Sequence, residues 1–127
     1  MKKIFLLIGC IGLQLNLYSQ DIATARTQGE GATVTISGIV TNGNELGSPI
    51  RYIEDATAAL AIYDPEVMGS VNRGDSITVT GVLVDYNGLL QVQLLDVNEF
   101  YIHGSGYSIN PQLITPNQIG EDTESEL

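Results

Sequence analysis

Two glycines stand in the middle of segments that otherwise have the pattern of β-strands. Gly38 lies within residues 33–41, where apolar side chains alternate with polar ones, and Gly81 interrupts residues 76–84, which otherwise make a good strand. This period-2 alternation is typical of a strand with one buried face. A glycine weakens such a strand, but it is favoured where the strand must bend as a sheet closes into a barrel. We therefore interpret both glycines as marks of a closed barrel, and Gly81 in particular as a closure residue rather than part of an active site.

The remaining segments predict the number and order of the strands. Asn87-Gly88 is a strong signal for a tight hairpin turn, which joins residues 76–84 to a further strand over residues 89–97. The other expected elements are strands over 50–55 and 59–64, a short helix within 65–74, and a helical turn over 21–28 with Asp21 as its cap. This order predicts an all-β fold, a five-stranded OB-type Greek-key barrel with a short helix between strands 3 and 4.

The first 19 residues have the pattern of a secretory signal peptide. Lys2 and Lys3 precede an apolar run, and cleavage after the small residue Ser19 would release a secreted or periplasmic protein. The alternative is processing at Cys10, the only cysteine, which would attach a lipid anchor. No other apolar stretch is long enough to span a membrane. We expect three regions: a signal peptide at 1–19, the barrel with its helical turn at 20–101, and an extended linker with an acidic tail at 102–127.

The charge balance limits the kinds of partner that the protein can attract. The chain has 5 basic and 15 acidic residues and a net charge of −10. Loss of residues 1–19 removes two of the basic residues and none of the acidic ones, so the net charge of the exported protein becomes −12. Non-specific attraction to a phosphate backbone depends on clustered lysines and arginines. Sequence-independent binding to nucleic acid through phosphates is therefore disfavoured.

Several short stretches, in this order and spacing, carry a resemblance to a known family. They are "IATAR", "VTISGIVT", "YIED" leading into "ALAIY", "RGDSITVTG" and "YNGLLQV". Together they resemble the OB-fold nucleic-acid-binding-like domains of secreted bacterial proteins, which are often found beside extracellular endonuclease/exonuclease domains. The resemblance covers residues 22–100, and it implies a binding module that is accessory to a nuclease-like protein. It also implies that a further domain follows the barrel if the chain is a fragment of a longer protein.

The sequence shows no constellation of catalytic residues. His103, the only histidine, falls in the expected linker, and we interpret it as a linker residue rather than a general base. Asp55, Asp64 and Asp75 each follow or precede a strand, where aspartate commonly caps a turn, and metal binding is the alternative. The acidic tail is expected to be a solvated connector, with a weak divalent-cation site as the remote alternative. We expect no enzymatic activity, no cofactor and no metal.

The candidate ligand-binding residues follow from where OB barrels hold their ligands. This is the outer face of strands 2 and 3 together with the loops that join strands 1–2 and 4–5. On this chain those places carry the loop over residues 42–48 and the candidate contacts Arg51, Tyr52, Tyr63, Tyr86 and Asn87. Exposed tyrosines would stack on the bases of single-stranded nucleic acid, or equally on sugar rings. The alternatives are that these tyrosines only cover the barrel, and that the partner is a protein or a glycan.

Overall fold

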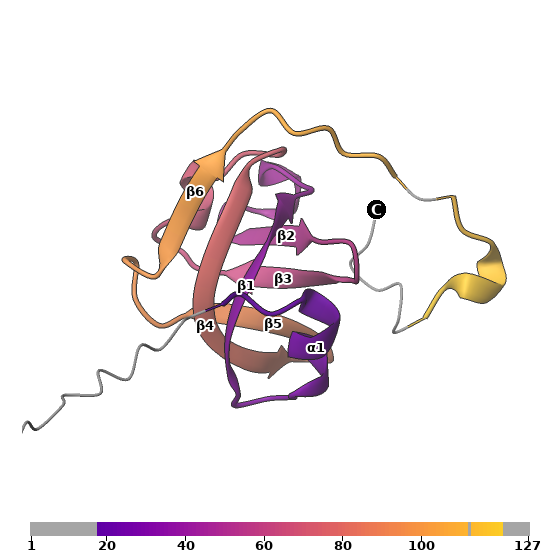
Figure 1. The fold of residues 1–127 in the computed structure, drawn as a ribbon, viewed down its shortest axis with the longest axis horizontal. Coiled ribbons are helices and arrows are strands. Elements are labelled where there is room, and N and C mark those ends of the chain that lie inside the picture. Colours follow the sequence, from indigo (N-terminus) through magenta and orange to yellow (C-terminus); the bar gives the residue numbers. More distant parts are fainter. Residues whose placement is uncertain (1–17, 112, 121–127) are drawn as a thin grey trace, which may run out of the picture.

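The computed structural model describes residues 18–111 and 113–120 and contains one short α-helix and a single sheet (Figure 1). No helix in these ranges is long and apolar enough to cross a membrane. The elements in chain order are α1 (Ile22–Thr27), β1 (Thr33–Val40), β2 (Ile50–Glu54), β3 (Ala59–Tyr63), β4 (Ser76–Tyr86), β5 (Leu89–Leu94) and β6 (Phe100–Gly104), with 3-10 turns at Asn44–Leu46, Met68–Ser70 and Pro116–Gln118.

Five of the strands close into a ring, which confirms the predicted barrel. The sheet order is β1-β2-β3-β5-β4, and a further pairing of β1 with β4 joins the two ends. The β3–β5 contact is parallel, and the other contacts in the ring are antiparallel. Each strand of the ring therefore pairs with a neighbour on both sides over at least part of its length, which limits the exposed sheet edge.

Gly81 and Gly38 occupy places where a side chain would collide with the neighbouring strand. A Cβ on Gly81 would lie 2.2 Å from the carbonyl oxygen of Gln93 and 2.6 Å from a methyl carbon of Val92, both on β5. A Cβ on Gly38 would lie 2.6 Å from the carbonyl oxygen of Glu54 on β2. These close approaches occur where β4 meets β5 and where β1 meets β2, so both glycines let neighbouring strands of the closed ring come close together.

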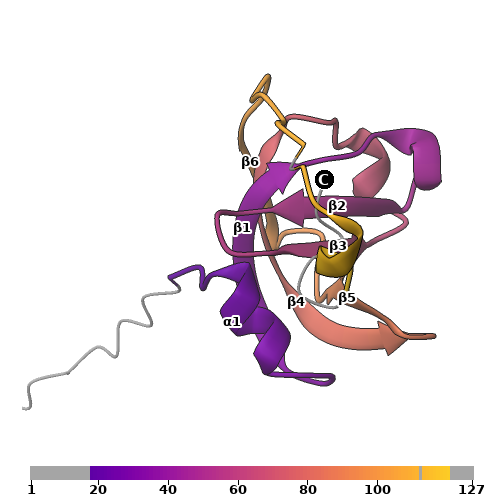
Figure 2. The same ribbon diagram turned by 90° about the vertical axis from the view of Figure 1, so that its right-hand side faces the viewer.

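The helix expected within residues 65–74 is shorter than predicted. Between β3 and β4 the chain forms only the 3-10 turn that buries Met68, whereas the helical turn predicted over residues 21–28 forms α1, the α-helix of the described residues, which lies against the barrel (Figure 2). Asp21 caps α1 as predicted, because its carboxylate accepts a hydrogen bond of 2.7 Å from the backbone N–H of Thr24. Ile22 and Ala25 are fully buried in the barrel core. The two residues lie three apart on one helix face, and this spacing lets a six-residue helix contribute to the core.

The core is filled by alternate side chains of the strands and by the helical turns. Its fully buried members are mostly branched aliphatic residues, as expected inside a small barrel. They include Val34, Ile36, Ile53, Leu60, Ile62, Ile77, Val79, Leu83 and Val92.

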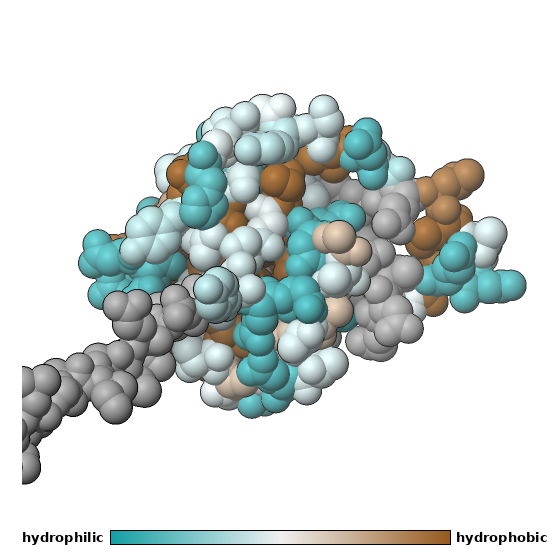
Figure 3. All heavy atoms as spheres, in the orientation of Figure 1, coloured by the Kyte–Doolittle hydropathy of each residue, from teal (hydrophilic) through white to brown (hydrophobic). Residues whose placement is uncertain are grey.

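A sixth strand lies where the sequence predicted the start of a linker. β6 pairs with the first half of β4 and lies outside the five-stranded ring. His103 is therefore not in a linker, and its Nε2 atom lies 2.6 Å from the hydroxyl oxygen of Thr78. The strand was missed because Tyr101 and Ile102 are both exposed, so the alternation that marks a half-buried strand is absent. Residues 105–111 have no regular secondary structure, and Leu113 and Ile119, on either side of the 3-10 turn Pro116–Gln118, are exposed. Figure 3 shows hydrophobic surface on the segment that projects at its right.

Candidate ligand-binding face

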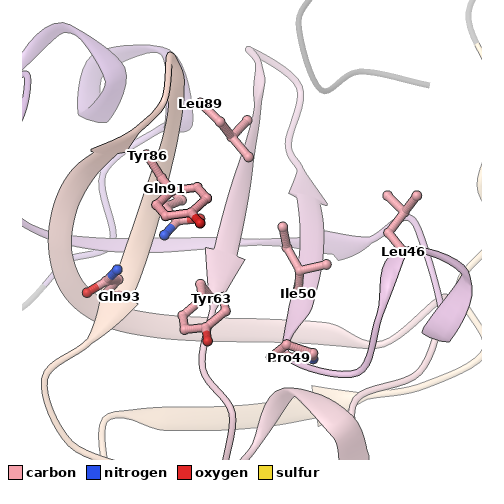
Figure 4. Close-up of a pocket in the computed structure, with 8 residues that line it drawn as sticks. All are labelled: Leu46, Pro49, Ile50, Tyr63, Tyr86, Leu89, Gln91 and Gln93. Carbon is pink, nitrogen blue, oxygen red and sulfur yellow. The ribbon is translucent and has the colours of Figure 1, made fainter.

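A cavity of about 490 Å³ opens on the outer face of β2, β3 and β5 (Figure 4). We call it the face cavity. Its lining comes from the loop between β1 and β2, from the strands themselves and from the end of β4. The lining residues are Leu46, Pro49, Ile50, Tyr63, Tyr86, Leu89, Gln91 and Gln93. This is the face on which OB barrels hold their ligands, and the volume lies within the usual range of about 300–1,000 Å³ for small-ligand sites.

Strand alternation and register bring these side chains together. In β5 the side chains of Leu90 and Leu94 pack against the core, so those of Leu89, Gln91 and Gln93 point to the outer face. Across the strands, Ile50 lies opposite Tyr63, Tyr63 opposite Gln93, and Tyr86 opposite Leu89.

Two tyrosine rings are available to a ligand at this cavity. Tyr63 ends β3 and is 36% exposed, and Tyr86 ends β4 and is 62% exposed. Both are lining residues of the face cavity and are labelled in Figure 4. Aromatic faces in such positions stack on planar or ring-shaped groups, and each stacked base contributes about 1–3 kcal/mol.

The side-chain amide of Gln91 is the least exposed polar group of the face cavity. Gln91 is 3% exposed, and no hydrogen bond joins its side chain to any other residue in the described ranges. Its neighbours across the sheet are Ala61 on β3 and Val84 on β4, whose side chains have no polar atom. No amide atom of Gln91 is sealed from solvent without a partner. The amide therefore faces the cavity, where a ligand can reach it.

No charged side chain is among the described residues that line the face cavity. The arginines of the barrel are all engaged elsewhere. Arg26 donates a 2.8 Å hydrogen bond to the carbonyl of Ala59, and Arg73 forms a 2.6 Å ion pair with Glu45 on the surface. The cavity therefore favours uncharged groups over phosphates.

Arg51, a predicted ligand contact, has another role in the structure. The residue is 1% exposed and its guanidinium donates hydrogen bonds to backbone carbonyls, the shortest being 2.7 Å to Ile50 and 2.8 Å to Val71. It also donates a 2.7 Å bond to the side-chain oxygen of Asn44. The pKa of Arg51 is lowered, because burial lowers it more than the nearby carboxylate of Glu45 raises it. The guanidinium nevertheless remains charged at neutral pH. Arg51 thus holds the loop that forms one wall of the face cavity, and a ligand on the outer face does not meet it.

The two other predicted contacts lie near the face cavity but not among its lining residues. Tyr52 is half-buried on β2, on the same face as Ile50, and lies opposite Ala61. Asn87 forms the β4–β5 turn in the left-handed conformation, with a φ of 56°, as the Asn-Gly signal predicted. The structure therefore brings together Tyr63 and Tyr86 from the predicted set.

The other lining residues were not predicted, although the sequence contained a signal for two of them. The alternation in residues 89–97 places Gln91 and Gln93 on the outer face, but an exposed glutamine in a strand is ordinary. Only the parallel β3–β5 pairing, which puts Gln93 beside Tyr63, brings this outer face to the face cavity. Leu46 and Pro49 belong to the predicted loop but were not singled out.

The aspartates act as caps, which agrees with the interpretation from sequence. Asp55 accepts a 2.6 Å hydrogen bond from the hydroxyl of Thr57 and further bonds from the backbone N–H groups of Thr57 and Ala58. It also accepts a 2.8 Å bond from the N–H of Ile22 at the start of α1. Burial raises the pKa of Asp55, but these hydrogen bonds outweigh it, so the pKa lies below its usual value. Asp64 and Asp75 cap turns in the same way. Within the described ranges no group of three potential metal ligands is present.

The fold and the cavity define the class of protein, an OB-type barrel with a hollow on the outer face of β2, β3 and β5 whose described lining residues carry no charge. Among solved structures, the hypothetical protein ygiW from E. coli is similar, with a TM-score of 0.53 and 11% sequence identity. The match covers 67% of this chain and 89% of ygiW. At this identity the similarity shows the fold alone. No protein-family model and no curated protein matches the sequence.

Proposed function

We propose that the protein is a non-catalytic binding module that holds single-stranded nucleic acid weakly, through its bases rather than its phosphates. One observation carries the proposal: two exposed tyrosine rings, Tyr63 and Tyr86, line a cavity on the outer face of an OB-type barrel, and none of its described lining residues is charged. Stacking needs no sequence match, because every base presents an aromatic face.

The few basic residues of the protein determine the affinity of such binding and its dependence on salt. Each neutralised phosphate contributes a slope of about 0.7 to the dependence of log affinity on log salt for single strands. The chain has three arginines in the barrel region, and Arg51 is buried. Few phosphates can be neutralised, so the affinity should be modest and its salt dependence shallow.

A titration of labelled single-stranded oligonucleotide at low and at moderate salt tests the proposal. Tyr86→Ala should weaken binding by about fivefold or more, the equivalent of roughly 1 kcal/mol of stacking. Tyr101→Ala is the matched control, because Tyr101 is similarly exposed, at 58%, but lies on β6 away from the cavity. Absence of binding with ~100 μM protein at ~20 mM salt, where ordinary non-specific binding is detectable, would contradict the proposal. So would tight binding that collapses steeply with salt.

A protein or glycan partner is the second candidate, and the acidic surface favours it. The net charge of −10 does not hinder contact with a neutral sugar or with a basic protein surface, and aromatic rings also stack on sugar rings. If neutral oligosaccharide binds and loses affinity in Tyr86→Ala, while oligonucleotide does not bind, this candidate replaces the first.

The setting of the module is also a proposal. We propose that the protein is exported through residues 1–19, most of which lie outside the described residues, and acts as an accessory to an extracellular nuclease-like domain. The amino-terminal pattern and the resemblance of residues 22–100 support it. Reading the gene beyond codon 127 tests the partnership, because a nuclease-type domain is expected there, whereas an adhesive or anchoring domain would favour the second candidate.

A further inference from the structure

We propose that Gln91 determines which groups the face cavity accepts, by hydrogen bonding to the edge of a base that stacks beside it. The inference rests on the proposed function and deepens it. According to this inference, Gln91 discriminates between two kinds of ligand. It favours a base whose edge presents a hydrogen-bond donor beside an acceptor, and it disfavours a group that lacks such an edge.

The burial of Gln91 makes its amide selective. A polar group that is desolvated without a partner costs about 1–3 kcal/mol. Gln91 is already 3% exposed, so a ligand that fills the cavity removes the remaining water from its amide. Such a ligand must replace that water with its own hydrogen-bond donor and acceptor. Otherwise the amide stays unpaired, and the binding free energy is weakened by that penalty.

The protein itself leaves the amide free for this purpose. Ala61 and Val84 flank Gln91 across the sheet and have no polar side-chain atom. No other described residue donates to the amide or accepts from it. An aliphatic residue would pack at this position without any unmet hydrogen bond, so stability alone does not explain a glutamine here.

The chemistry of the amide favours a base over a sugar. A primary amide presents one acceptor oxygen beside a donor NH₂ group, and glutamine pairs through both with the edge of adenine. Single-stranded recognition commonly combines such edge contacts with stacking on aromatic side chains. Tyr63 and Tyr86 supply the rings around the same cavity. The lining residues that the structure describes carry no charge, which agrees with an uncharged base edge.

The experiment compares two oligonucleotides on three proteins. The oligonucleotides are oligo-adenylate and the same oligomer with N6,N6-dimethyladenine, which retains the ring but has no N6 donor. The proteins are the wild type, Gln91→Met, and Gln28→Met as a matched change at an exposed glutamine at the end of α1. Wild type and Gln28→Met should prefer the unmodified oligomer by about 5- to 150-fold, the factor of one bidentate base contact. Gln91→Met should bind both oligomers equally and should unfold at an unchanged or higher denaturant concentration.

The outcomes separate this inference from the proposed function. Binding that depends on Tyr86 but is indifferent to methylation and to Gln91→Met overturns the inference and leaves the proposed function standing. Absence of oligonucleotide binding to the wild type overturns both. Binding of a neutral oligosaccharide that Gln91→Met abolishes, with no oligonucleotide binding, overturns the base assignment in favour of a glycan.

Discussion

Replacing Gly81 with alanine should destabilise the barrel, because the position has no room for even one carbon atom. The added Cβ would lie 2.2 Å from the carbonyl oxygen of Gln93, whereas ordinary contact begins at 3.4 Å. The neighbouring atom is backbone, so it cannot rotate away, and β4 and β5 must separate by about 1 Å. Overpacking of this kind costs about 1–3 kcal/mol, and for a domain of this size each kcal/mol lowers the melting temperature by about 4–8 °C.

The assay is urea unfolding of Gly81→Ala beside the matched variant Gly69→Ala. Gly69 lies in a 3-10 turn, where the nearest atom to an added Cβ is Ser48 Cβ at 3.9 Å. We expect Gly69→Ala to unfold like the wild type and Gly81→Ala to lose about 2 kcal/mol or more. Equal unfolding midpoints for the two variants would refute the argument that Gly81 is required for closure. Because Gln93 lines the face cavity, Gly81→Ala should also weaken ligand binding.

Three further predictions follow from single residues or segments. Arg51→Met should destabilise by about 1–3 kcal/mol, because it leaves the buried carbonyl of Val71 unpaired; an unchanged urea midpoint would show that Arg51 does not hold the loop. The lowered pKa of Asp55 means that its carboxylate stabilises the fold above about pH 4 and that this stability is lost as the pH falls through the lowered value. Asp55→Asn should therefore flatten the loss of stability on acidification, and equal acid sensitivity in the two proteins would count against it. The intact mass of the exported protein should match a chain that begins at Gln20. A mass that matches a lipid-modified chain beginning at Cys10 would indicate an anchor instead.

The barrel was predictable because its signals are local. Alternation located the strands over residues 33–41 and 89–97, Asn87-Gly88 located the hairpin, and Gly38 and Gly81 indicated closure. β6 was not predictable in this way, because both faces of a strand outside the ring can be exposed. Tyr101 and Ile102 show this, since both are more than 40% exposed.

The candidate site was predictable only in part, because it depends on contacts between distant segments. Tyr63 and Tyr86 were found from their places in the expected barrel. The role of Arg51 was not predictable, because an arginine on a strand is normally expected to face the solvent. Its burial against the 44–50 loop is visible only in the structure. The importance of Gln91 for ligand binding likewise depends on its neighbours Ala61 and Val84, whose side chains offer its amide no hydrogen bond. The β3–β5 and β4–β5 pairings bring these two residues beside it.

The most direct test of base binding at the face cavity is a nuclear magnetic resonance titration of ¹⁵N-labelled protein with a short single-stranded oligonucleotide. The account predicts that the side-chain NH₂ signals of Gln91 and Gln93 shift, together with the backbone signals of Tyr63, Tyr86 and residues 89–93. The signals of β6 should stay in place, because that strand lies outside the ring and away from the cavity. Shifts confined to β6 or to the surface around Arg73, with the Gln91 signal unchanged at saturation, would contradict the account.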